Sequence, residues 1–308
     1  MSRLRSTSGG LAATALAFRD NVPADARHAV RAPLRVAANH ISIALWMAIF
    51  FFAAANLRGG EPKIVVQPDK WGDASKEDIA KVLESAAREF CRHFPEAIDP
   101  IDVRRGKGYP QVLFRRGPNR EYQVQLDVEG TFWAQFAFQF AHELCHIQCR
   151  YREVRHPNHW FEEMLCETAS LYTLRQMADA WKTKPPYANW KSFAPRLADY
   201  AQKRIDEARL AEDATLAIWY ESHERELREN GTLRDLNLVA ASAILPLLEK
   251  SPSSWEAVTW LNASQVENDQ PLADFLQRWH DRCPPRHHAF IRTLAAEFGI
   301  PLPEREKD

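Results

Sequence analysis

The feature that most constrains this chain is the pentapeptide His142–His146, of sequence HELCH, inside a long apolar segment without proline or glycine. Apolar residues recur every four positions from Phe132 to Leu144, which predicts a buried helix over residues 131–150 with Thr131 as its N-cap. Residues four apart share one face of a helix, so both imidazoles of the pentapeptide can reach a single ion. Burying them without a partner would be costly, and a metal ion removes that cost.

The spacing indicates a zinc site, with His142 and His146 as ligands and Glu143 as the general base that activates a water molecule. Two alternatives stay open. The histidines can be ordinary core residues with satisfied hydrogen bonds. A structural zinc site of histidine and cysteine is also possible, with Cys149 and Cys166 as its thiol ligands.

A catalytic zinc site needs a third protein ligand and an open position for water. The segment 158–172 reads as a second helix, and on it Glu163 and Glu167 are four residues apart and share a face. If Glu163 binds the metal, Glu167 can accept a hydrogen bond from the outer nitrogen of a ligand histidine. Such outer carboxylates fix the tautomer of the imidazole.

An HExxH sequence followed by a helix with Glu-x-x-x-Glu resembles the gluzincin branch of zinc metallopeptidases, the thermolysin and aminopeptidase type. Residues Trp160–Glu167 are similar to the WxxEGxAE segment of that branch, although Met164 stands where many relatives have glycine. The resemblance covers roughly residues 120–175. It implies Zn²⁺ as cofactor, Glu163 as the third ligand, Glu167 behind a ligand histidine, and a peptide or protein as substrate.

The metzincin pattern HExxHxxGxxH does not fit, because Cys149 and Arg152 replace its glycine and third histidine. A gluzincin site normally has a further donor for the oxyanion, typically tyrosine or histidine. The sequence offers four candidates for this role and does not choose between them: Tyr172, Tyr200, Tyr220 and His223.

The resemblance and the patterns together predict an α+β fold. It comprises a zincin-like domain with a small N-terminal β-sheet and an HExxH active-site helix, followed by a mostly helical C-terminal subdomain. The predicted strands are Lys63–Gln67, Gln111–Phe114 and Glu121–Val128, and Ser75–Phe94 is predicted to be an amphipathic helix. By analogy with zincins, we expect Glu121–Val128 to be the edge strand that pairs with substrate.

Two regions follow from this division, a metal-binding core over 61–180 and a helical subdomain over 181–308. Helices in the second region are predicted over 190–209, 233–249, 254–262, 271–282 and 286–298. The tryptophans of this half are expected to be core anchors.

The run 41–57 carries no charge, and arginines are more frequent before it than after it. We therefore expect a transmembrane signal anchor over 37–57, a disordered cytoplasmic N-terminus over 1–36, and the rest of the chain on the periplasmic or extracellular side. The alternative is a signal peptide whose cleavage near Ala53 releases a secreted protein.

A net charge of −1 gives no sign of a nucleic-acid partner. Export would permit disulfides among the five cysteines, and Cys149–Cys166 is the candidate pair. Buried free thiols are the alternative. Two functions compete on the sequence: peptide-bond hydrolysis by a membrane-anchored or exported zinc peptidase, and a catalytically inactive zincin-like binding or scaffold protein of the cell envelope.

Overall fold

The computed structural model describes residues 61–154, 156–265 and 267–303, all within one compact unit. The expected N-terminus over 1–36 and the expected anchor or signal peptide over 37–57 lie outside these residues. Among the helices that are described, none combines the length and the apolar character needed to cross a membrane.

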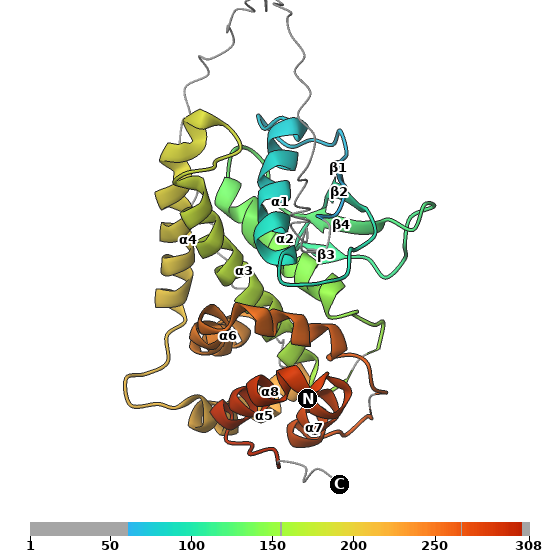
Figure 1. Ribbon diagram of the computed structural model, residues 1–308, viewed down its shortest axis with the longest axis vertical. Helices are drawn as coiled ribbons and strands as arrows, with labels where there is room; N and C mark the ends of the chain where they lie inside the picture. Colours follow the sequence, from blue (N-terminus) through green and yellow to red (C-terminus); the bar gives the residue numbers. More distant parts are fainter. Residues whose placement is uncertain (1–60, 155, 266, 304–308) are drawn as a thin grey trace, which may run out of the picture. The chain divides into compact units, whose positions relative to one another are not determined.

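The fold is α+β. The first part of the described chain forms a small sheet together with helices, and the rest of the chain is helical (Figure 1). The sheet has the order β1-β2-β4-β3, in which β1, β2 and β4 are parallel and β3 is antiparallel to β4. Its strands are β1 (Ile64–Val66), β2 (Ile101–Arg105), β3 (Gln111–Val112) and β4 (Tyr122–Leu126). Three of them coincide with predicted strands, whereas β2 was not predicted.

The expectation that the strand Glu121–Val128 lies at the edge of the sheet is wrong. Strand β4 lies between β2 and β3, so both of its edges are already paired, and the free edge on this side belongs to β3. Alternation of polar and apolar residues indicates a half-buried strand, but it carries no information about the neighbours of that strand. The side chains of Val66, Val103 and Val124 stand side by side across the sheet and are buried.

Helices α1 (Lys76–Cys91) and α2 (Trp133–Gln148) contact each other and the sheet, which places them on the same face (Figure 1). As predicted, α1 begins after Ser75, whose side chain accepts a hydrogen bond from the amide of Asp78 at 3.0 Å. The HExxH helix α2 begins two residues later than predicted. Its N-cap position is occupied by Phe132, without a side-chain cap.

Helix α3 (His159–Trp181) is the longest helix described and packs against α1, α2, α4 and α6. The expected boundary at residue 180 falls one residue before its end, so α3 is shared by both regions. The helical region contains α4 (Ala194–Glu207), α5 (Leu216–Glu229), α6 (Arg234–Lys250), α7 (Leu272–Arg282) and α8 (His288–Glu297), with short 3-10 helices at Ala188–Phe193, Pro252–Trp260 and Pro285–His287.

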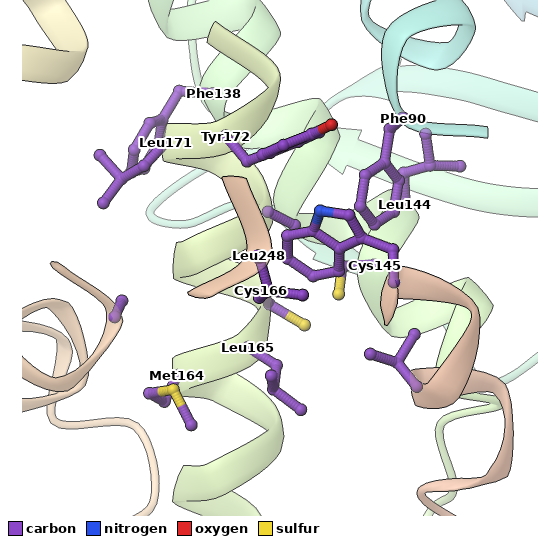
Figure 2. Close-up of a cluster of buried hydrophobic side chains, with 14 of the residues drawn as sticks. Phe90, Phe138, Leu144, Cys145, Met164, Leu165, Cys166, Leu171, Tyr172 and Leu248 are labelled. Atoms are coloured by element: carbon purple, nitrogen blue, oxygen red, sulfur yellow. The ribbon is translucent and has the colours of Figure 1, made fainter. Parts of the chain in front are cut away.

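The five segments predicted to be helical are helical, although the one over 254–262 is a 3-10 helix. Helix α5 was not predicted. Figure 2 shows part of the core between the two regions, where apolar side chains from α1, α2, α3 and α6 meet. Five tryptophans of the chain's second half are buried in the core, as expected: Trp181, Trp190, Trp219, Trp255 and Trp279.

Candidate metal centre

The HExxH motif lies in the C-terminal half of α2, where the rings of His142 and His146 face α3 with their centroids 5.0 Å apart. Helix α3 lies against α2 and is fixed there by the hydroxyl of Ser170, which donates to the carbonyl oxygen of Phe138 at 2.8 Å. This packing brings Glu163, near the start of α3, to the two imidazoles.

The Nε2 atoms of the two imidazoles both face Glu163. His142 Nε2 lies 3.2 Å from one carboxylate oxygen, and His146 Nε2 lies 3.5 Å from the other. Ligand atoms bound to one tetrahedral zinc at about 2.0–2.1 Å are about 3.4 Å apart. The two N···O distances are close to this value, and two imidazole nitrogens with one carboxylate are donors that zinc prefers.

The outer nitrogen of His146 has a carboxylate partner that the sequence did not predict. His146 Nδ1 lies 2.7 Å from Glu162 Oε1, and Asn262 Nδ2 donates to Glu162 Oε2 at 2.7 Å. The same amide group donates to the carbonyl oxygen of Cys149, at the end of α2, at 3.0 Å. A proton on Nδ1, directed at Glu162, leaves the Nε2 lone pair available to a metal.

Glu167 is the carboxylate behind His142, but the hydrogen bond expected of it is not formed. Its Oε1 lies 3.7 Å from His142 Nδ1, longer than a hydrogen bond. Its Oε2 is buried and has no hydrogen-bond partner among the described residues.

The charges of this cluster are strongly coupled. Burial lowers the pKa of His146, but the charge of Glu163 and the hydrogen bond to Glu162 outweigh it and raise that pKa to about 10. His142 shifts in the same direction: burial opposes the shift, and Glu163 and Glu167 raise its pKa. Without a metal, both shifts favour protonation of the histidines. A cation of charge +2 can take the place of those protons.

Glu143 follows His142 on α2 and is only 2 % exposed. Burial raises the pKa of its carboxyl, while the nearby His142 and His146 and a hydrogen bond from the backbone of Val112 lower it. Val112 belongs to β3. Its neighbour Leu113 donates to Gln123 of the adjacent strand at 2.8 Å, so the amide of Val112 points to the free edge of the sheet.

Two further donors lie close to the imidazoles. His159, the first residue of α3, has its Nε2 3.1 Å from Glu163 Oε1, and its ring stacks on His146. Sequence reasoning missed His159, although it precedes Glu163 by four residues and so shares its face. The thiol of Cys166 also lies within 4.8 Å of ligand nitrogens of His142 and His146. We favour Glu163 over Cys166, because each of its oxygens faces one Nε2 atom.

The four expected oxyanion donors have other contacts. The hydroxyl of Tyr172 pairs with His93 Nε2 at 2.8 Å, and Tyr220 stacks on Trp160. His223 Nδ1 lies 2.8 Å from the carbonyl oxygen of Trp219 in its own helix. Tyr200 packs edge-on against Phe138. Burial raises the pKa of its phenol, and the charge of Glu167 also raises that pKa.

Comparison of the chain with protein-family models, with curated proteins and with solved structures gives no match. The function is therefore inferred from the geometry of the site.

Proposed function

We propose that this protein is a zinc-dependent peptidase with a zincin-like fold, in which His142, His146 and Glu163 hold the metal. The observation that carries the proposal is the convergence of two imidazole Nε2 atoms on the two oxygens of one buried carboxylate, at 3.2 and 3.5 Å. When bound, zinc would supply a Lewis acid and a water molecule of lowered pKa.

Glu143 is the general base in this proposal. It follows His142 directly on α2, and the backbone of Val112 holds its carboxylate. It would accept a proton from the attacking water and deliver that proton to the leaving amine. Glu162 keeps the imidazole of His146 in the tautomer that binds metal, and Glu167 acts on His142 through its charge. His159, which the sequence analysis did not select, supplies a donor for the developing oxyanion.

The free edge of β3 supports a peptide as the substrate. This two-residue strand lies beside the general base, its outer edge pairs with no other described strand, and an extended peptide can add to such an edge. Tyr109 and Phe114 flank this strand and are 56 % and 52 % exposed. Their exposure favours peptides with apolar side chains near the bond to be cleaved.

The test is zinc content and peptide cleavage measured on the same preparations of the full-length chain. Wild type is expected to hold about one zinc and to cleave a mixed peptide library. Glu143→Gln is expected to keep the zinc and lose cleavage by a factor of about 10² or more, because the base is gone and the ligands remain. Loss of zinc in Glu143→Gln would contradict the assigned role.

A second function is favoured by His159 and by the burial of Glu143. If His159 joins the other three ligands, four protein donors close the coordination sphere, as in structural zinc sites. The protein would then be a catalytically inactive, zinc-stabilised binding or scaffold protein. In that case wild type would hold zinc without cleaving any peptide, Glu143→Gln would behave as wild type, and His159→Ala would lose zinc. Under the peptidase proposal, His159→Ala keeps the zinc and loses activity.

A further inference from the structure

A second group of potential ligands lies on the same two helices, and the proposed function does not use it. The sulfur atoms of Cys145, Cys149 and Cys166 all lie within 4.8 Å of one another, and those of Cys145 and Cys149 are 4.0 Å apart. We call these three residues the thiol cluster. All five cysteines of the chain are free thiols, so the expected pair Cys149–Cys166 forms no disulfide.

The thiol cluster is fully enclosed, since each of its three side chains has an exposed fraction of 0 %. Figure 2 shows the sulfur atoms of Cys145 and Cys166 directed into a common space, with Leu144 and Leu165 nearby. Cys149 is the C-cap residue of α2, where the chain leaves the helix for the loop before α3. Local opening at this helix end is the route by which the thiols can be reached.

We propose that the thiol cluster is a binding site for a three-coordinate thiophilic ion, separate from the histidine–glutamate centre. Thiolate sulfur selects soft ions over the harder ions that prefer carboxylate and water. An ion in the plane of three sulfurs, with bonds of about 2.3 Å, holds them about 4.0 Å apart, and a pyramidal ion holds them somewhat closer; the sulfurs of Cys145 and Cys149 are 4.0 Å apart. Zinc, by contrast, requires a fourth ligand.

Arsenite suits this buried site in two ways: it binds three thiols, and the resulting complex carries no net charge. As(OH)₃ reacts with three thiols to form three As–S bonds and three molecules of water, without oxidation or reduction. The product is neutral, so no net charge is left in the core. Cuprous ion is another soft ion that binds three sulfurs, but with three thiolates it leaves a buried negative charge. Both carry the same three-sulfur chemistry, and the experiment distinguishes them.

The experiment uses the full-length, metal-free protein, reduced with a phosphine and titrated with arsenite alone. Native mass spectrometry is expected to show one arsenic per chain with loss of three waters, and X-ray absorption at the arsenic edge to show three sulfur neighbours. A folded wild-type protein that binds no arsenite and no cuprous ion would overturn the proposal, as would a bound ion with only two sulfurs. A parallel titration with cuprous ion against a chromophoric chelator shows which ion binds more tightly.

Single serine variants locate the site. Each of three variants is expected to weaken ion binding by at least about tenfold: Cys145→Ser, Cys149→Ser and Cys166→Ser. Loss of a partner that does not itself touch the metal already weakens binding by about tenfold or more, and loss of a ligand should cost at least as much. Cys283→Ser is the matched control: it removes a buried thiol that contacts the carbonyl oxygen of Ala257, away from the thiol cluster. Equal losses in this control would contradict the assignment. Glu163→Gln is expected to bind arsenite normally, so failure of the zinc proposal leaves this test intact.

Discussion

The two donor groups differ sharply, although the same pair of helices supplies both. The histidine–glutamate centre has further carboxylates beside it, and its central carboxylate, Glu163, retains 15 % side-chain exposure. The thiol cluster has no exposed side chain and lies among apolar residues. The two sets even alternate along the chain, with Cys145 beside His146 and Cys166 between Glu163 and Glu167.

This comparison shows how one helix pair can present two kinds of ligand. Neighbouring residues on a helix point about 100° apart, so Cys145 and His146 leave α2 in different directions. The side that meets carboxylates and water suits a borderline ion such as zinc, whereas the apolar side suits softer ions. The two groups therefore differ in their surroundings. Variants of one group can be tested for their effect on ion binding at the other.

The largest effect is expected from removing the carboxylate ligand. Glu163→Gln should weaken zinc binding by more than about 10²-fold, since loss of a ligand exceeds the loss from any outer partner. Cys166→Ser should keep the zinc, because its thiol belongs to the other group. Competition against a fluorescent zinc chelator measures both. If Cys166→Ser lost zinc and Glu163→Gln kept it, the metal would belong to His142, His146 and Cys166 instead.

The outer partners of His146 should give a smaller loss. Glu162→Gln is expected to weaken zinc binding by about 10–100-fold, because the imidazole loses the carboxylate that fixes its tautomer. Asn262→Ala should cost less, since the carboxylate remains and only its orientation is released. The same chelator assay applies, and arsenite binding should not change in Glu162→Gln, whereas Asn262→Ala also releases the carbonyl oxygen of Cys149 and is read for zinc alone. An unchanged zinc affinity in Glu162→Gln would show that the contact at 2.7 Å is incidental.

The pH dependence of stability should separate the metal-free from the zinc-loaded protein. The pKa of His146 is raised from 6.5 to about 10 in the folded chain, so its contribution to the free energy of unfolding is complete below pH 6.5. That contribution is lost as pH rises toward 10. Zinc replaces the proton and should remove this loss. Urea unfolding at several pH values measures it, with metal-free His146→Gln as reference for the other titrating groups. A metal-free wild type that matches His146→Gln at every pH would contradict it.

A change at Gly231 should disturb the histidine–glutamate centre alone. A Cβ atom at this position would lie 2.9 Å from the amide nitrogen of Trp160 and 3.2 Å from the side chain of His159. Gly231→Ala must therefore shift the start of α3, at a cost of about 1–3 kcal/mol in stability. Thermal unfolding measures this loss of stability. Zinc affinity should fall by a few-fold while arsenite affinity stays constant, because the thiol cluster lies farther along the helix.

Parts of this molecule followed from local sequence patterns. Periodicity fixes which residues share a helix face, so Glu163 and Glu167 could be placed on one face of their helix, and the resemblance to gluzincins directed that face at the motif histidines. Asn262 could not, because it lies 100 residues from Glu162 and the fold alone brings them together. Helix α5 was missed because only Leu216, Trp219, Tyr220 and Leu227 of it are buried, which leaves mostly charged residues in the pattern.

The sheet shows the same limit. Strand β2 has only five residues and includes a buried aspartate, Asp102, which pairs with Gln67 and Arg104. Its residues Ile101–Arg104 do alternate apolar and polar, but aspartate is depleted in strands, so a segment this short is a weak signal by itself. The order of strands depends on which segments meet in space, and so the edge position of β3 could not be derived from either segment by itself.

The amide of Asn262 has a consequence for how this chain can be divided. Its two hydrogens join the end of α2 to the carboxylate behind His146, so a residue of the helical half completes a centre whose ligands all lie in the other half. The two halves are therefore not interchangeable modules. A gene encoding residues 61–180 alone would lack this link, and grafting the segment onto another helical partner would require an equivalent amide at the same place.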